Sequence, residues 1–378
     1  MKNIYFIFVI IISFTLNSCK EKQHKKPKEL STEKSSIKYA KLFNITAYKN
    51  YKKITLTNPW DSTKIHKEYY LVSKKTEIPD KIKNRLIVRT PIENCAVLAT
   101  PYIGYLNKLN KIHTINAIGE IQYVSNKELL KAFTSNTITE IGGAHNLNTE
   151  LVIDLKPEVL FCSGSQAPNK HLTQIDKFNI PVIYGFDWME NTPLARAEWL
   201  KFIAAFTAQE EQATHVFNQI EKQYLSLKNR AKTSVKKPKI LVGQEWKGVW
   251  NTPSGNSYLG NLLQDVEVNY YWSSTKKSGS LNLSFEEIYD KQADSDFWLN
   301  PGMINNLEEL TANDPRLTSF KSIQNNQVYN YTKQGVNAYW ENAGVNPDIV
   351  LSDLLKILHP ELLPDYQLSY YTKVESRK

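Results

Sequence analysis

Residues 150–161 read ELVIDLKPEVLF, and a degraded echo of this stretch, EEIYDKQADSDFW, occupies residues 286–298. In each copy a glutamate opens a short amphipathic helix, and a later acid, Glu158 or Asp294, leads into an apolar strand. One helix-to-strand unit used twice predicts two similar lobes, each with an exposed glutamate at a matching place. Matched acidic side chains on two lobes suggest a clamshell that presents both faces to a single partner.

Length and composition are those of a globular protein with more than one domain. The chain of 378 residues is long enough for two domains with substantial cores. Its apolar fraction of 41% and charged fraction of 22% are ordinary. Aromatic residues are abundant, with 21 Tyr and 8 Trp, and we expect most of them to pack in the cores.

The first residues predict a targeting signal. Lys2 precedes an apolar run, residues 4–16, that is too short to span a bilayer but suits the core of a signal peptide. Residues 16–19 read LNSC, which resembles a bacterial lipobox, so we expect a signal peptide over 1–18 and acylation of Cys19. The alternative is an ordinary secretory signal with a chance cysteine. Lipidation would place the protein at the cell surface or facing the periplasm, anchored to a membrane through Cys19.

A lysine-rich segment follows this cysteine. Residues 20–41 contain eight Lys against three Glu, a large part of the formal net charge of +9. We expect residues 19–41 to form a disordered tether, either beside an anionic membrane or simply solvated. The rest of the chain has no concentrated basic stripe, so we expect no nucleic-acid partner.

The two remaining cysteines lie in apolar, strand-like runs. Cys95 is in NCAVLA and Cys162 is in VLFCSG, and neither has the C-x-x-C spacing of a metal site. We expect buried free thiols rather than a disulfide.

The order of predicted elements indicates an α/β fold. Residues 43–88 alternate strand-like runs with turn signals, which predicts β-hairpins added to the first lobe. From residue 91 strands and helices alternate, which predicts a mainly parallel sheet covered by helices. The predicted strands of this lobe are 92–99, 114–118, 159–162 and 182–184, and its predicted helices are 102–110, 126–133 and 169–178.

A helical pattern without internal Gly or Pro runs over residues 193–231. It predicts a single long helix, within a linker of 193–233, between a first lobe of 42–192 and a second lobe of 234–378. The second lobe has predicted strands at 240–243, 297–299 and 328–331 and predicted helices at 258–263 and 347–358, besides the helix that Glu286 opens.

Two phrases of the first lobe resemble a known family. AVLATPYIGYLNKLNKIHTINAIG, residues 96–119, and NLNTELVIDLKPEVLFCSG, residues 146–164, are similar to segments of the periplasmic binding proteins for vitamin B12 and ferric siderophores. The likeness covers roughly residues 85–358 and is weaker in the second lobe, where Ala293 replaces the usual proline. Residues 43–84 fall outside the common core.

The resemblance implies a lipid-anchored, monomeric solute-binding protein of an ABC importer. Its ligand would be a ferric siderophore, haem or cobalamin held between the lobes and passed to a permease with its ATPase. The family docks one glutamate of each lobe onto arginines of the permease, which implies Glu150 and Glu286 here, with Glu287 as the alternative to the second. Both glutamates are also explained by the preference for negative charge in a first helical turn.

Loops that follow strands are where open α/β sheets place their ligands. We expect ligand contacts from residues on such loops, because several aromatic rings there suit a large planar or macrocyclic ligand. Hydrophobic packing under a loop is the alternative for each tryptophan. The candidates are Tyr102, His145, Ser163, Asp187, Trp188, Trp246, Trp250, Trp272 and Trp340.

Other chemistries have weak support in the sequence. Of seven histidines only His145 sits on a predicted cleft loop, which disfavours a bare-metal site. The glycines at 142–143 lack the Lys-Ser/Thr of a phosphate loop, and no Ser/His/Asp set can be matched. We therefore expect no cofactor and no catalysis. An adhesion lipoprotein that binds a protein partner, and an enzyme recruited onto the two-lobed frame, remain the alternative functions.

Overall fold

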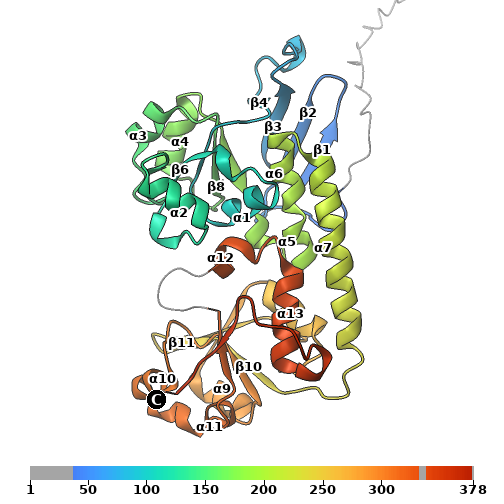
Figure 1. The fold of residues 1–378 in the computed structure, drawn as a ribbon, viewed down its shortest axis with the longest axis vertical. Helices are drawn as coiled ribbons and strands as arrows, with labels where there is room; N and C mark the ends of the chain where they lie inside the picture. The colour runs from blue at the N-terminus through green and yellow to red at the C-terminus, as the bar shows by residue number, and fades with distance from the viewer. Residues whose placement is uncertain (1–36, 332–337, 377–378) are drawn as a thin grey trace, which may run out of the picture.

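The computed structural model describes residues 37–331 and 338–376, which form two lobes joined by helices (Figure 1). The predicted signal peptide and Cys19 lie outside these residues. Within the described ranges, no helix combines the length and apolar character needed to cross a membrane.

The first lobe contains a five-stranded parallel sheet in the order β7-β6-β5-β8-β9. Alternate residues of β8 enter two different cores, Val159 and Phe161 on one face and Leu160 and Cys162 on the other. Both faces are therefore covered, as the sequence predicts. The elements are β5 (Cys95–Val97), α1 (Pro101–Lys108), β6 (Ile115–Ile118), α2 (Lys127–Thr134), β7 (Thr139–Glu140), α3 (Thr149–Leu155), β8 (Val159–Ser163), α4 (Lys170–Lys177) and β9 (Val182–Gly185).

A separate four-stranded sheet precedes this lobe in the chain and lies beside α6 (Figure 1). It confirms the predicted N-terminal hairpins, with β1, β2 and β3 antiparallel and β4 parallel to β3. The Tyr69 hydroxyl joins it to β9, donating to the carbonyl of Val182 at 3.1 Å and accepting from the amide of Tyr184 at 2.9 Å. The strands are β1 (Phe43–Ala47), β2 (Lys52–Thr57), β3 (Ile65–Ser73) and β4 (Ile87–Thr90).

The linker is three helices, so the prediction of a single long helix over residues 193–231 is wrong. They are α5 (Pro193–Ala197), α6 (Trp199–Thr207) and α7 (Glu210–Ala231). The α5–α6 junction is mild, because Glu198 keeps helical angles (φ −66°, ψ −13°). The second break is sharp, because Ala208 adopts the left-handed conformation (φ 53°, ψ 45°). Helices α6 and α7 then lie side by side, and α7 alone runs from one lobe to the other (Figure 1).

The second lobe has a four-stranded sheet in the order β10-β14-β15-β16. Its first three strands are parallel and β16 is antiparallel to β15. A three-stranded antiparallel sheet of β11, β12 and β13 accompanies it. The strands are β10 (Ile240–Val242), β11 (Gln244–Trp246), β12 (Val249–Pro253), β13 (Ser280–Leu283), β14 (Phe297–Leu299), β15 (Val328–Asn330) and β16 (Thr372–Lys373). The helices are α8 (Tyr258–Asp265), α9 (Phe285–Gln292), α10 (Leu307–Asn313), α11 (Lys321–Gln324) and α13 (Pro347–Leu358).

Short 3₁₀ helices punctuate the loops of both lobes. They are η1 (Asp80–Ile82), η2 (Ile112–Thr114), η3 (Ile121–Tyr123), η4 (Asp187–Met189), η5 (Pro315–Ser319) and η6 (Pro360–Leu362).

One short helix of the second half of the chain, α12 (Ala338–Asn342), packs against α1 of the first lobe (Figure 1). The approach is so close that a Cβ on Gly104 would lie 2.1 Å from the carbonyl oxygen of Glu341. The buried Glu341 carboxylate accepts the amides of Ser125 at 2.7 Å and Asn126 at 3.2 Å. This helix, which the prediction places in the second lobe, therefore packs on the first lobe as well, while its Tyr339 lies in the core of the second lobe.

The predicted tether also ends too late. Residues 37–42, which we call the strap, lie along the start of the linker. Their backbone is held by carboxylates of Glu190 and Glu198. Residues 37–41 are thus part of the fold.

Candidate functional site

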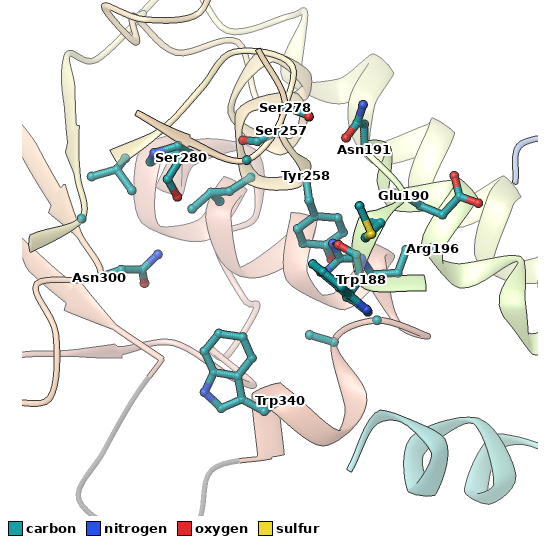
Figure 2. Close-up of a pocket in the computed structure, with 18 of the residues that line it drawn as sticks. Trp188, Glu190, Asn191, Arg196, Ser257, Tyr258, Ser278, Ser280, Asn300 and Trp340 are labelled. Atoms are coloured by element: carbon teal, nitrogen blue, oxygen red, sulfur yellow. The ribbon is translucent and has the colours of Figure 1, made fainter. Parts of the chain in front are cut away.

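A cavity of about 570 Å³ lies between the two lobes (Figure 2). Its walls come from the first lobe, the start of the linker, the second lobe and α12, so residues far apart in the sequence meet there. Side chains that line it include Asp187, Trp188, Asn191, Arg196, Gln244, Ser257, Tyr258, Ser280, Asn300 and Trp340.

The first-lobe wall is the turn that follows β9. Asp187 is buried, and the Tyr105 hydroxyl donates to its Oδ2 at 3.5 Å. Burial raises the pKa of Asp187, and the nearby positive charge of Arg196 opposes part of that rise. The next residue, Trp188, is 47% exposed and lines the cavity.

The linker wall is a stacked pair that joins the two lobes. The guanidinium of Arg196, on α5, lies 3.8 Å from the ring centroid of Tyr258, on α8. One Nη of Arg196 donates to the carbonyl of Trp188 at 2.9 Å. Its Nε is buried and has no hydrogen-bond partner among the described residues. Figure 2 shows Trp188, Arg196 and Tyr258 gathered on one side of the cavity.

The second-lobe wall is polar and is organised around a helix start. Ser257 caps α8, its hydroxyl accepting the amide of Gly260 at 3.0 Å. Ser278 and Ser280 lie near it in Figure 2, and Asn300 lies further along the same wall. The wall thus offers hydroxyl and amide groups that suit an oxygen-rich ligand.

Trp340 on α12 lies across the cavity from this group (Figure 2). It is 56% exposed and contacts the rings of Tyr331 and Tyr339 edge-on, each at a centroid distance of 5.3 Å. The two tyrosines stack on each other at 4.0 Å. An exposed indole held by packed rings is a ready surface for a planar ligand.

Comparison with known proteins identifies this architecture. A family profile described as "Periplasmic binding protein" matches residues 96–334. The chain belongs to this family. The resemblance noted in the sequence is thereby confirmed.

Solved periplasmic binding proteins share the fold. The haem-binding protein HutB of Vibrio cholerae aligns with a TM-score of 0.56 at 17% identity, covering 71% of this chain and 99% of that one. The vitamin B12-binding protein BtuF of Vibrio cholerae gives a TM-score of 0.51 at 13% identity, covering 71% of this chain and 97% of that one. An uncharacterized lipoprotein of Methanocaldococcus jannaschii is 24% identical over 362 residues, 89% of this chain and 85% of the relative.

Three predicted ligand residues of this periplasmic binding protein line the cavity, namely Asp187, Trp188 and Trp340. Three others do not, because they are buried in cores: Tyr102, Trp250 and Trp272 are 1%, 1% and 6% exposed. Tyr102 donates to the carbonyl of Cys162 at 2.9 Å and Trp250 to that of Val242 at 3.1 Å. The polar atoms of Tyr102 and Trp250 are thus already used inside the protein, and Trp272 is packed in the second-lobe core, so the structure does not place these three residues at the cavity.

The other three predicted residues are exposed but lie outside the cavity lining. His145 follows the glycine pair after β7, and Ser163 ends β8. Trp246, 65% exposed, sits beside the tight turn of Lys247 and Gly248 that joins β11 to β12. The cavity is thus confined to a smaller part of the loop region than the sequence suggests.

Arg196 and Tyr258 were missed by sequence reasoning. Arg196 lies in the helical run of residues 193–231, where only the spacing of the apolar residues carries the prediction. Tyr258 enters the prediction only as the first residue of a helix. A helix that begins at a Ser cap is a usable signal, because it places the first side chains of α8 at a strand-end loop.

The two glutamates that open the repeated unit are exposed and occupy equivalent places. Glu150 is the second residue of α3, which Asn148 caps, and Glu286 is the second residue of α9, which Ser284 caps. Glu287 is the third residue of α9, so it does not occupy the position that Glu150 has in α3. Glu128, the second residue of α2, has the same place in its helix, so helical position alone does not identify a docking residue.

The described residues contain no cluster of three or more His, Cys, Asp or Glu that could hold a metal ion. Cys95 and Cys162 are free and buried, as predicted. Burial raises the pKa of Cys95 to about 12 and raises that of Cys162 as well, so both thiols stay protonated near neutral pH.

Proposed function

We propose that this periplasmic binding protein captures an iron chelate (a siderophore or haem) or a corrinoid and delivers it to an ABC permease. The observation that carries the proposal is the cavity of about 570 Å³ that both lobes and the linker line. This volume is typical of small-molecule sites. Several structurally similar proteins are named for the binding of haem or vitamin B12.

Aromatic and charged groups in the cavity support a ligand of this class. Trp188 and Trp340 offer exposed indole rings from opposite sides, which suits a planar macrocycle or aromatic chelating groups. Among the described lining residues, Arg196 supplies the basic side chain and would meet a carboxylate or other acidic group of the ligand.

We assign permease docking to Glu150 and Glu286. Each is exposed at the start of a helix, one on each lobe. A carboxylate in such a place can accept two parallel bonds from a guanidinium, and each charged bond contributes about 1.5–3 kcal/mol. Cys19 would carry the lipid that keeps the protein near the permease.

The proposal is tested first by ligand-induced quenching of tryptophan fluorescence. The panel is haemin, cyanocobalamin and ferric siderophores of the catecholate and hydroxamate classes. At least one should quench with saturation, and Trp188→Phe and Trp340→Phe should each reduce the quenching. Trp246→Phe is the matched control, because Trp246 is exposed but outside the cavity. No saturable quenching by any member would reject the proposal.

Docking is tested by the pair Glu150→Ala and Glu286→Ala together. The double variant should keep the affinity of the free protein for its ligand, because neither residue lines the cavity, but should lose most ligand uptake by cells that carry the permease. Glu128→Ala is the control, since it removes a glutamate from the same helical position of α2. Unchanged uptake in the double variant, or an equal loss in the control, contradicts the assignment.

A further inference from the structure

The strap, residues 37–42, is bound by its backbone to two carboxylates of the linker region. The amides of Lys38, Tyr39 and Ala40 donate to the carboxylate of Glu198 at 2.6–3.0 Å. The oxygen atoms of Glu198 are fully buried, and Lys201 donates to one of them at 2.7 Å. A buried carboxylate that accepts several amides is a strong attachment, because each of these bonds is charge-assisted.

Glu190 binds the next two amides of the strap through a single oxygen. Its Oε1 accepts from Lys41 at 2.9 Å and Leu42 at 3.0 Å, and also from the indole Nε1 of Trp199 at 3.3 Å. Five consecutive backbone N–H groups, residues 38–42, are therefore held by two side chains. Such a run has no counterpart in helix or sheet pairing, so the two carboxylates account for the course of the strap.

The side chain of Glu190 and its backbone face different ways. Figure 2 shows the carboxylate pointing away from the cavity, while the residue itself is part of the lining together with its neighbours Trp188 and Asn191. A second cavity of about 230 Å³ lies behind this wall, lined by Tyr39, Lys41 and Leu42 of the strap as well as by Glu190 and Asn191. The strap thus touches the back of the wall whose front faces the larger cavity.

Glu190 and Glu198 also bracket α5, which carries Arg196. Because the strap binds both Glu190, before α5, and Glu198, after it, the strap fixes the distance between the two ends of this helix. Arg196 reaches Tyr258 of the second lobe from this helix, so its position depends on that of α5.

We propose that the strap is a positioning element for the ligand-binding wall, with Glu190 holding residues 187–191 and Glu198 holding the end of α5. The proposal rests on the proposed function only in calling this wall ligand-binding. No residue of the strap lines the larger cavity, so the strap acts on that cavity through Glu190 and the residues beside it.

The test is hydrogen exchange of the whole protein, read by mass spectrometry, in Glu190→Ala and Glu190→Gln. The wild type should protect the amides of 38–42. Glu190→Ala should speed exchange at 41–42 by about tenfold or more and also speed exchange at 187–191. Glu190→Gln should restore most protection at both places, because its Oε1 can accept the same three bonds.

Two controls keep the result specific. Glu221→Gln changes a strap contact at α7, where Glu221 accepts from Lys38 and Tyr39, and should leave 187–191 unchanged. Lys41→Pro removes the amide that donates to Glu190 but leaves the Glu190 side chain unchanged. It should speed exchange at 187–191 as Glu190→Ala does, but by a smaller factor. If 38–42 exchange freely in the wild type, or if a loosened strap leaves exchange at 187–191 unchanged, the proposal is wrong. Because the readout needs no ligand, a failure of the fluorescence panel would not affect it.

Discussion

Buried carboxylates that accept backbone amides recur in this protein as attachments between distant segments. Glu198 holds the strap, and Glu341 holds residues 125–126 of the first lobe. Asp353, fully buried on α13, accepts the amides of residues 369–371. Each acid fixes a stretch of chain that has no strand or helix partner there. Removing one would leave two or three N–H groups, most of them partly buried, without this acceptor, at up to about 1–3 kcal/mol each.

Asp187 is a buried acid whose charge has a measurable cost. Because burial raises its pKa in the folded protein, the folded state holds the proton more readily than the unfolded chain does. The stability of the wild type relative to Asp187→Asn should be greatest in acid and fall as the pH rises above the ordinary value of 3.8, levelling off past the folded pKa. Urea unfolding of both proteins between pH 4 and about pH 7 checks this. A stability difference that stays constant or grows with pH would contradict it.

At the scale of elements, the break after α6 is the feature that the sequence hides. Ala208 has left-handed angles, which cost an L-residue with a side chain roughly 1–2 kcal/mol relative to glycine. The residues around Ala208 include no glycine or proline. The spacing of the apolar residues therefore predicts a continuous helix across the break. What stabilises it is the packing of α6 on α7, which only the tertiary structure supplies.

Ala208→Gly should therefore stabilise the protein by about 1 kcal/mol, measured as a higher urea midpoint. If residues 193–231 formed one continuous helix, the same change would destabilise it by about the same amount. Lys222→Gly, at an exposed position inside α7, is the control and should cost about 0.5–1 kcal/mol.

The contact of α12 with α1 predicts a second effect at this scale. Gly104→Ala would place a methyl group 2.1 Å from the carbonyl oxygen of Glu341, so α12 must move. We expect a loss of about 1–3 kcal/mol in unfolding free energy and faster hydrogen exchange at residues 125–126. Gly344→Ala is the matched control, because its nearest neighbour atom is 3.5 Å away and no strain is expected. Equal effects of the two changes would argue against a tight α1–α12 contact.

Much of the fold, but less of the site, could be predicted from the sequence. The parallel sheet follows from runs such as that of β8, whose residues are apolar on both faces. The two short helices that the glutamates were expected to open are present as well, capped by Asn148 and Ser284. The sequence does not show whether a tryptophan near a strand end is buried or faces a ligand. The ring of Trp250 packs on that of Trp298 at a centroid distance of 5.5 Å, whereas Trp188 is exposed. No neighbouring residue in the sequence distinguishes the two cases.

The strap shows a different limit of sequence reasoning. It lies at the end of residues 20–41, whose lysine-rich composition is that of an unstructured tail. The acids that order it, Glu190 and Glu198, lie about 150 residues further along the chain. Composition describes a segment alone, so it cannot report a partner that only folding brings near.

For the whole molecule, two connections restrict the relative motion of the lobes. Helix α7 spans the gap, and α12 fastens the second half of the chain to α1. We expect a largely preformed cleft with little closure on ligand binding.

Spin labels at residues 154 and 290, on exposed positions of α3 and α9, would measure this closure. The labelled protein would carry Cys19→Ser, and the buried Cys95 and Cys162 should not react. The distance between the two labels, measured by double electron–electron resonance with and without the ligand found by fluorescence, should change by less than about 2 Å. A change of several ångströms would show that the two connections do not hold the lobes.

The crossing of α12 has a consequence for any attempt to dissect the protein. A fragment that stops at the end of the linker would retain the surface of α1 but lose the helix that shields it, together with the acceptor for the amides of 125–126. A fragment that begins at residue 234 would keep Tyr339 of α12 in the second-lobe core but would leave uncovered the face of α12 that meets α1. The two halves are therefore not independent domains. A chimera in which one lobe is replaced by that of a homologue would also need an α12 that fits the surface of α1.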